Sequence, residues 1–449
     1  MIRMRLSELA AALDCPAPQR DVTIDAIVAD SRRVDYGALF AALPGSQVDG
    51  HDFAPAAVKL GAVALLVNRR LDLDVPQLVV ADVLHALGRL AALLRQRLDP
   101  LVIGITGSNG KTTVKEMVAG ILKPAGPILA TRGNYNNELG LPLSLFALEP
   151  RHRFAVLELG ASKAGDIAYL ADIARPDIGL ITNIGPAHLK GFGSEEGVAH
   201  AKGEMYAALP ADGYAIVNAD EPWKEYWLQV NRAGNVLTFG SGPECDVQVA
   251  GDEQCPVIRT PEGAFDLRLA LPGAHNRLNA AAATTVALAA GIGLDSIRHG
   301  LEGVGPVPGR LNFIETAAGW TVIDDTYNAN PASLYSALQV LSSMQGTPWL
   351  VLGDMKELGT DSPKMHREVG DAAKAMGVKR LFATGDMSVH AVDAFGAGAE
   401  HFATREELAE TLRRSLHPGI NCLVKGSRSM GMEAVVEAVT RDAGMREAI

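Results

Sequence analysis

The stretch that decides the fold is LVIGITGSNGKTTVKEMV, residues 101–118. Residues 101–105 are apolar apart from one glycine and predict a buried strand. Residues 107–110 (GSNG) predict a tight loop, and residues 111–113 (KTT) open a helix. Strand, glycine loop, Lys-Thr and helix in this order are typical of a phosphate-binding site, because backbone N–H groups and the helix N-terminus face the anion. We therefore predict that this stretch binds a nucleotide.

Two side chains of this stretch suit a triphosphate. Lys111 supplies a mobile cation for the β- and γ-phosphates, and the hydroxyl of Thr112 can ligate Mg²⁺. The match to the general pattern G-x-x-x-x-G-K-[ST] is imperfect, because that pattern places a glycine where this chain has Ile105. The alternative is a merely structural turn, but the order of the parts favours a nucleotide site.

Composition excludes several classes of protein. The net charge of −11 argues against general binding to nucleic acid or to a membrane surface, since those partners require a basic surface. The apolar stretch 278–294 is rich in Ala and Thr and is interpreted as a buried helix, not a membrane span. The N-terminus shows no secretory signal, and the four cysteines show no C-x-x-C spacing. We therefore predict a cytoplasmic protein without membrane insertion, disulfides or a zinc site.

The pattern of elements predicts three α/β domains, which is within the two to four that 449 residues suggest. Residues 1–82 form a first small unit, and a helix over 82–99 leads into the domain of the phosphate loop. Residues 235–271 are expected to make a hairpin region. The Gly/Pro-rich segment 303–313 marks the second boundary, and strand–helix repeats beyond it predict a parallel sheet. The predicted domains are 1–82, 83–308 and 309–449.

Charged residues close to predicted strands of the second domain are candidate metal ligands. FAVLELGAS, 154–162, is a buried strand that ends at Glu158, and a carboxylate at a strand end is the expected Mg²⁺ partner of the loop threonine. The alternative for Glu158 is a salt-bridged core residue. A third strand, in DIGLITNIGPAHL, is expected to end at His188, which is either a ligand or a structural histidine. Lys202, in a helix over 195–209, is interpreted from the sequence alone as a solvated lysine.

Three further segments carry candidate binding residues whose roles the residues alone leave open. Ser31 and Arg32 can bind a phosphate, or can form a surface turn with solvated charges. The Gly- and Asn-rich segment 131–145 is equally compatible with a substrate loop and with an ordinary loop. Asn279, at the start of the Ala-rich helix, can contact an adenine edge, although a helix cap explains it as well.

Taken in order, the motifs resemble the Mur ligase family of ATP-dependent amide-forming enzymes of peptidoglycan synthesis. The resemblance covers essentially the whole chain, and its motifs are DSRRVxxGxLF, TGSNGKTT, GNYNN, ELGAS, the Gly-Pro-Ala-His turn, HNRLNAAAA, GRL and DDTYNANP. GNYNNELGLP and DDTYNANPASL look like the member that adds D-alanyl-D-alanine to UDP-N-acetylmuramoyl-tripeptide. The preceding ligase usually carries an Asp-Asn-Pro-Arg motif that this chain lacks.

The resemblance implies a small N-terminal UDP-binding unit, a central P-loop ATPase-like parallel sheet and a C-terminal Rossmann-like parallel sheet. It also implies ATP, two Mg²⁺ ions and an acyl-phosphate intermediate. The nucleotide-binding residues it implies are Gly107, Ser108, Asn109, Gly110, Lys111, Thr112, Thr113, Asn279, Arg310 and Asp325. The metal ligands it implies are Thr112, Glu158, His188 and Lys202, and Lys202 stands where family members often carry a carbamylated lysine. The catalytic residues are Lys111, Glu158, His188 and Lys202, and the substrate-binding residues are Ser31, Arg32, Asn134, Asn137, Tyr327, Asn328 and Asn330.

Two alternatives remain open after the resemblance. One is a non-catalytic nucleotide-binding protein with the same fold, which predicts the loss of Lys111, Glu158 or His188, whereas all three are present. The other is a different amide ligase, such as the relative that forms the tripeptide, and DDTYNANP is the stretch that separates the two. The expected partners are the two small substrates, and the expected oligomeric state is a monomer.

Overall fold

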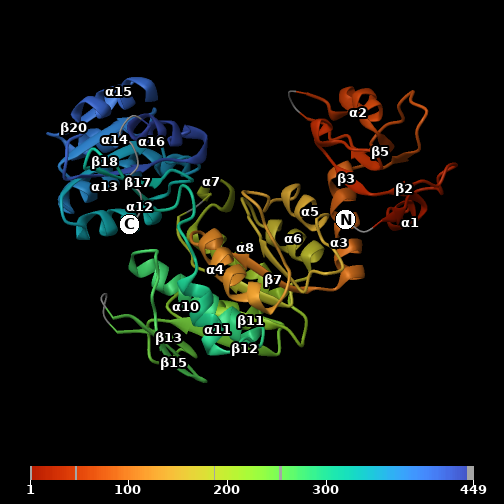
Figure 1. Ribbon diagram of the computed structural model, residues 1–449, viewed down its shortest axis with the longest axis horizontal. Helices are drawn as coiled ribbons and strands as arrows, with labels where there is room; N and C mark the ends of the chain where they lie inside the picture. Colours follow the sequence, from red (N-terminus) through yellow and green to blue (C-terminus); the bar gives the residue numbers. More distant parts are fainter. Residues whose placement is uncertain (1–2, 46–47, 187, 252–254, 442–449) are drawn as a thin grey trace.

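The computed structural model describes residues 3–45, 48–186, 188–251 and 255–441, which form three lobes in chain order (Figure 1). The outer ends of the first and third predicted domains, residues 1–2 and 442–449, and residue 187 of the Gly-Pro-Ala-His turn lie outside the described residues. The N-terminal and C-terminal lobes lie on opposite sides of the central lobe (Figure 1). Within the described residues, none of the helices combines the length and the apolar character that a membrane crossing requires.

The N-terminal lobe is built on a four-stranded parallel sheet in the order β3-β4-β5-β6, with a two-stranded antiparallel sheet of β1 and β2 beside it. All four residues of β4 are buried, which fits a strand covered on both faces. The elements are β1 Met4–Arg5, α1 Leu6–Ala12, β2 Thr23–Ile24, β3 Ala26–Val28, η1 Ser31–Arg33, β4 Ala38–Ala41, η2 Gly50–Phe53, α2 Ala54–Leu60, β5 Ala62–Val67 and β6 Gln77–Val79.

Helix α3, Val83–Leu98, connects the first two lobes and was predicted from its apolar spacing. The Asp82 carboxylate accepts a hydrogen bond from the backbone N–H of His85 at 3.0 Å and caps the first turn. Val83, Leu87, Leu90 and Leu94 are buried along one face, as the helical period requires. This face packs against α5, Gly140–Leu145, and α6, Asp166–Ala174, of the central lobe.

The central lobe holds a nine-stranded sheet in the order β15-β14-β13-β12-β11-β10-β7-β9-β8. It is parallel from β8 to β13, and β14 and β15 extend it as antiparallel hairpins. The predicted hairpin region is therefore confirmed for β13 to β15, while β12 continues the parallel sheet. The elements are β7 Leu101–Thr106, α4 Lys111–Leu122, η3 Lys123–Ala125, β8 Ile128–Ala130, α5 Gly140–Leu145, β9 Phe154–Glu158, α6 Asp166–Ala174, β10 Ile178–Ile181, α7 Leu189–Phe192, α8 Glu195–Ala207, β11 Tyr214–Asn218, α9 Lys224–Val230, β12 Asn235–Gly240, β13 Val247–Ala250, β14 Val257–Thr260, β15 Gly263–Asp266, α10 Ala274–Ala289 and α11 Leu294–Glu302.

The C-terminal lobe has a six-stranded sheet in the order β16-β17-β21-β18-β19-β20, in which only the edge strand β16 runs antiparallel among the described strands. The predicted parallel sheet is thus present, with one antiparallel strand added. The elements are β16 Asn312–Glu315, β17 Thr321–Asp325, α12 Pro331–Ser343, β18 Thr347–Gly353, η4 Gly359–Asp361, α13 Ser362–Ala375, β19 Arg380–Thr384, α14 Val389–Phe395, β20 Ala399–Phe402, α15 Arg405–Ser415, β21 Ile420–Lys425, η5 Arg428–Met430 and α16 Glu433–Thr440.

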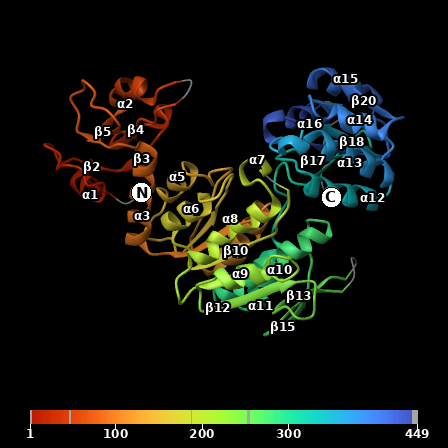
Figure 2. The same cartoon turned by 180° about the vertical axis from the view of Figure 1, so that it is seen from behind.

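The sheet register brings the candidate residues of the central lobe together. Glu158 lies opposite Ile105 at the ends of β9 and β7, and Thr106 lies opposite Ile181 at the end of β10. The prediction that the third strand ends at His188 was wrong, because β10 ends at Ile181 and His188 comes seven positions later, just before α7. The two views agree that the C-terminal lobe faces the central lobe near α7 (Figure 1, Figure 2).

Candidate nucleotide and ligase site

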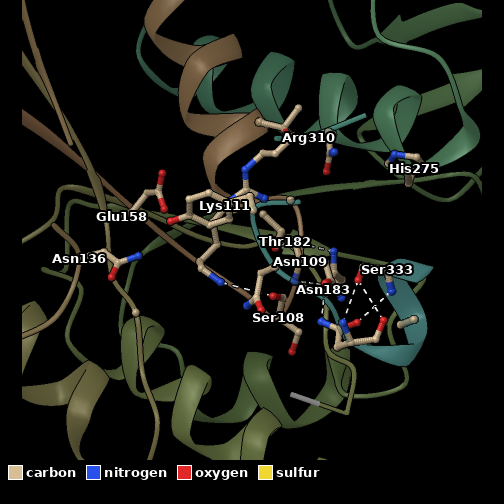
Figure 3. A pocket seen from close by; sticks show the side chains of 18 of the residues that line it. Ser108, Asn109, Lys111, Asn136, Glu158, Thr182, Asn183, His275, Arg310 and Ser333 are labelled. Carbon is tan, nitrogen blue, oxygen red and sulfur yellow. Dashed lines mark hydrogen bonds between the residues drawn. The ribbon is translucent and has the colours of Figure 1, made fainter. Parts of the chain in front are cut away.

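A cleft of about 650 Å³ lies between the central and C-terminal lobes. Its walls include the loop after β7, the ends of β9 and β17, the start of α10 and the start of α12 (Figure 3). Ligands of open α/β sheets gather at such carboxyl ends of strands. Most residues predicted for the site line this cleft, and they are Ser108, Asn109, Gly110, Lys111, Thr113, Asn134, Asn137, Glu158, His188, Lys202, Asn279, Arg310, Asp325, Tyr327, Asn328 and Asn330.

At two positions of the phosphate loop, the backbone conformation and the space around it suit only glycine. Gly107 has φ +146° and Gly110 has φ +81°, and Gly110 precedes the first residue of α4. A Cβ atom on Gly107 would lie 1.8 Å from Thr182 Oγ1, and one on Gly110 would lie 2.6 Å from Asn279 Oδ1. Asn279, predicted to contact adenine, thus packs against the phosphate loop, and its Nδ2 donates to Asn276 Oδ1 at 3.1 Å.

Lys111 lies over its own loop. Its Nζ donates to the carbonyl oxygen of Gly107 at 2.6 Å, and the side chain is drawn beside Ser108 (Figure 3). Burial lowers the pKa of the Lys111 amine to about 8, although the carboxylate of Glu158 opposes this shift. The Thr112 hydroxyl accepts a hydrogen bond from Arg310 Nη2 at 2.8 Å, so a side chain of the segment before β16 reaches the predicted metal-ligating hydroxyl.

Glu158 is almost completely buried, at 1% exposure. Its Oε1 lies 3.8 Å from Lys115 Nζ and has no hydrogen-bond partner among the described residues. A buried carboxylate oxygen without a partner is costly unless a cation joins it. Both alternatives for Glu158 thus have a structural basis, because it faces the cleft and also pairs with a buried lysine that the sequence analysis did not identify.

The two remaining candidate metal ligands gather around Phe192. The His188 ring lies 6.5 Å from the Phe192 ring in an edge-on arrangement, and Lys202 Nζ lies 6.0 Å from the centre of the same ring. Lys202 is only 2% exposed, so its interpretation as a solvated lysine was wrong. Burial and then the charge of Lys111 lower the pKa of Lys202 well below its ordinary value. Burial also lowers the pKa of His188, while the carboxylate of Glu357 opposes that shift.

The C-terminal lobe contributes a second group of side chains. The Arg310 guanidinium stacks 4.1 Å from the centre of the Tyr327 ring, and Asn330 Nδ2 donates to Asn109 Oδ1 at 2.8 Å across the cleft. Asp325 Oδ2 accepts a hydrogen bond from Lys425 Nζ at 2.5 Å. Burial raises the pKa of Asp325, and the charge of Lys425 opposes the shift. Lys425 also lines the cleft and was not among the sequence candidates.

Some predicted residues have other partners or lie elsewhere. Ser31 and Arg32 are in η1 of the N-terminal lobe and are not among the residues that line the cleft. Arg32 Nη2 donates to Asp30 Oδ2 at 2.9 Å, as the surface-turn interpretation expects. Asn137 Oδ1 accepts from the Gly140 N–H, the first residue of α5, at 2.8 Å. Its neighbour Asn136, which was not a candidate, lines the cleft near Glu158 (Figure 3).

His275 should make stability depend on pH. Burial lowers its pKa to about 4, so the unfolded chain binds more protons than the folded chain between about pH 4 and 6.5. Above pH 6.5, His275 should cost no free energy of unfolding. As the pH is lowered to 4, this histidine alone should reduce the free energy of unfolding by roughly 3 kcal/mol. Denaturant unfolding of His275→Gln from pH 7 to 4 should show a shallower loss than the unchanged protein. The exposed His299→Gln is the control, and equal slopes for all three proteins would contradict the expectation.

The fold and the cleft together describe a three-lobed α/β protein with a phosphate loop at the cleft between its central and C-terminal lobes. Family models match all three: "Mur ligase family, catalytic domain" over residues 23–95, "Mur ligase middle domain" over 105–287 and "Mur ligase, glutamate ligase domain" over 309–428. The chain belongs to the Mur ligase family.

Individual relatives match nearly the whole chain. The UDP-N-acetylmuramoyl-tripeptide–D-alanyl-D-alanine ligase of Escherichia coli (strain K12) is 43% identical over 447 residues, which cover 98% of this chain and 99% of the relative. A crystal structure of MurF from Acinetobacter baumannii is 35% identical, with a TM-score of 0.91 and coverage of 98% and 99%. A structure of MurF ligase from Thermotoga maritima in complex with ADP is 29% identical, with a TM-score of 0.84 and coverage of 93% and 97%.

Proposed function

We propose that this chain joins D-alanyl-D-alanine to UDP-N-acetylmuramoyl-tripeptide with ATP, giving UDP-N-acetylmuramoyl-pentapeptide, ADP and phosphate. The observation that carries the proposal is the 43% identity to a ligase named for this reaction, over 98% of this chain. The geometry supports it, since the phosphate loop and several polar side chains of the C-terminal lobe line the same cleft. The reaction belongs to cytoplasmic peptidoglycan precursor synthesis, and the chain acts as a monomer on small-molecule substrates.

The chemistry requires a carboxylate to become an electrophile. The terminal carboxylate of the tripeptide attacks the γ-phosphorus of ATP, and the bond from that phosphorus to the bridging oxygen breaks to give an acyl phosphate and ADP. The dipeptide amine then attacks the acyl carbon, and phosphate leaves. Lys111 and the N-terminus of α4 hold the phosphate oxygens and offset the repulsion between the two anions.

The residues of the cleft fit Mg²⁺. The Oε1 of Glu158, which has no hydrogen-bond partner among the described residues, is a hard, anionic oxygen donor in a buried place, and the Thr112 hydroxyl lies at the start of the phosphate-loop helix. Mg²⁺ that binds with a nucleotide usually takes one or two carboxylates together with phosphate oxygens, so a larger protein cluster is not required. When bound, Mg²⁺ offsets the negative charge that develops during phosphoryl transfer. Thr112 and Glu158 would hold one ion. His188 would support a second together with a carbamylated Lys202, because a carbamate offers the oxygen donors that an ammonium lacks.

The other residues orient substrates. Asn279 and Arg310 flank the phosphate loop and bind the nucleotide together with Asp325. Tyr327, Asn328 and Asn330 stand across the cleft, where the dipeptide approaches, and Asn134 and Asn137 line its opposite wall. Ser31 and Arg32 seat the UDP part on the N-terminal lobe, which requires the substrate to extend from that lobe to the cleft. The lowered pKa of Lys202 leaves its amine uncharged more readily, which is the form that carbamylation needs.

The deciding measurement is phosphate release from Mg-ATP with UDP-N-acetylmuramoyl-tripeptide, comparing D-alanyl-D-alanine with single amino acids. Release that requires the dipeptide and yields the pentapeptide product supports the proposal. Release with a single amino acid on the shorter precursor would assign the chain to the preceding ligase. ATP binding without turnover on either acceptor would favour a non-catalytic protein.

Glu158→Gln should separate the two interpretations of Glu158. Loss of the carboxylate charge is expected to lower kcat by about 10²–10³-fold, the usual effect of removing one electrostatic contact to a developing charge. It should also weaken Mn²⁺ binding in the presence of a non-hydrolysable ATP analogue. The matched control is Glu116→Gln, because Glu116 contacts the same Lys115 at 2.6 Å but its side chain is 43% exposed. Unchanged Mn²⁺ binding in Glu158→Gln would contradict a role for Glu158 as a metal ligand and would favour its interpretation as the salt-bridge partner of Lys115.

A further inference from the structure

The loop after β18, residues 354–358 (DMKEL), is held in one conformation by buried contacts. Asp354 is fully buried, and its Oδ1 accepts from the backbone N–H groups of Met387 and Ser388 at 3.0 and 2.8 Å. The backbone N–H of Met355 donates to His366 Nε2 at 3.0 Å, and Met355 itself is fully buried. These contacts fix the backbone on one side of Glu357.

Glu357 has a backbone conformation that is unusual for its residue type. Its φ is +65°, in the left-handed region, and its side chain is 60% exposed. A non-glycine residue stays in this region only where its surroundings impose it, and such residues concentrate at functional sites. Glu357 therefore projects from a loop that is rigid on its N-terminal side.

The partner of Glu357 lies on the central lobe. Its Oε2 contacts Nδ1 of His188, which also has a left-handed backbone, at φ +53°. The contact thus joins two strained residues from two lobes. His188 lines the cleft, and the other charged groups that act on it there are the cations Lys111 and Lys202. Glu357 supplies the anionic partner of this histidine.

A carboxylate only accepts hydrogen bonds, so Nδ1 of His188 carries the proton in this contact. The lone pair of the neutral ring then belongs to Nε2, which is the arrangement of histidine ligands whose second nitrogen donates to a carboxylate. We propose that Glu357 is a positioning residue, which holds the His188 ring for the second metal ion only while the C-terminal lobe is docked on the central lobe. This inference rests on the proposed function and adds a link between lobe docking and the metal site.

The test measures Mn²⁺ binding to the full chain by electron paramagnetic resonance, in the presence of a non-hydrolysable ATP analogue. Glu357→Ala is expected to weaken the weaker of two Mn²⁺ sites by about 10-fold, the lower end for loss of such a partner. The tighter site and the affinity for the nucleotide analogue should stay unchanged. His188→Ala should weaken the same site, and the double variant should bind no more weakly than His188→Ala, because Glu357 acts through His188.

Two further variants guard against a general structural effect. Glu357→Gly has no Cβ at φ +65° and should fold at least as well while showing the same loss of Mn²⁺ affinity. Glu406→Ala removes an exposed carboxylate on α15 and should change nothing. Unchanged Mn²⁺ binding in Glu357→Ala, or additive effects of the two substitutions, would overturn the inference. The inference would also fail if the unchanged protein bound only one Mn²⁺ ion. In that case, dipeptide-dependent phosphate release would still support the proposed function.

Discussion

Replacing Lys111 by methionine is expected to lower kcat for phosphate release by about 10³-fold, because the cation nearest the phosphate loop is removed while its aliphatic volume is kept. The affinity for ATP should fall at the same time. The measurements are phosphate release under saturating substrates and titration with a non-hydrolysable ATP analogue. Lys364→Met, on the exposed face of α13, is the matched control and should behave as the unchanged protein.

The same substitution should not lower stability. Burial already lowers the pKa of Lys111 to about 8, which means that the folded chain holds the charged amine at a cost. We therefore expect a melting temperature equal to or above that of the unchanged protein. ATP binding should also weaken as the pH rises through about 8, because the amine of the free protein loses its proton, and Lys111→Met should lack this dependence. If Lys111→Met had both a lower activity and a lower melting temperature, Lys111 would instead have a structural role.

The phosphate-loop region was predictable because its information is local. An apolar run, two glycines with positive φ and a Lys-Thr pair specify strand, turn and helix within 18 residues, and the structure has β7 and α4 there. The parallel sheets followed from the alternation of strands and helices. The short edge strands β16 and β20 escaped prediction, because four residues carry too little periodicity to separate a strand from a loop.

The candidate site was less predictable, because its contacts depend on register and on the approach of two lobes. Lys115 is one turn after Lys111 in sequence, yet only the placement of β9 beside β7 brings it to Glu158. Likewise, nothing local pairs Glu357 with His188, which lie 169 residues apart on different lobes. Lys425 is different. It ends the apolar run INCLVK, so the reasoning applied to the charge at the end of β9 would also have identified it.

Removal of Lys425 is expected to cause the largest loss of stability. Lys425 Nζ donates to Asp325 Oδ2 at 2.5 Å and to the carbonyl oxygen of Asn328 at 2.9 Å, and its side chain is 2% exposed. Breaking a buried ion pair on one side leaves the other charge without a partner and costs about 3–5 kcal/mol. Lys425→Met should therefore lower the free energy of unfolding of the C-terminal lobe by an amount of this order, measured by denaturant unfolding at pH 7.

The double variant Asp325→Asn, Lys425→Met should recover much of that loss, since neither charge then remains buried and the Asn side-chain oxygen can still accept from the Leu311 N–H, as Asp325 Oδ1 does at 3.2 Å. The deficit of the single variant should also depend on pH. Burial raises the pKa of Asp325 in the folded chain, and loss of Lys425 raises it further. Below about pH 4 the carboxyl is protonated in both the folded and the unfolded chain, so Lys425→Met should then show no loss of unfolding free energy from this charge. The loss should grow as the pH rises above that value. A deficit of equal size at pH 4 and pH 7, with no recovery in the double variant, would show that Lys425 stabilises the lobe by packing and not through its charge.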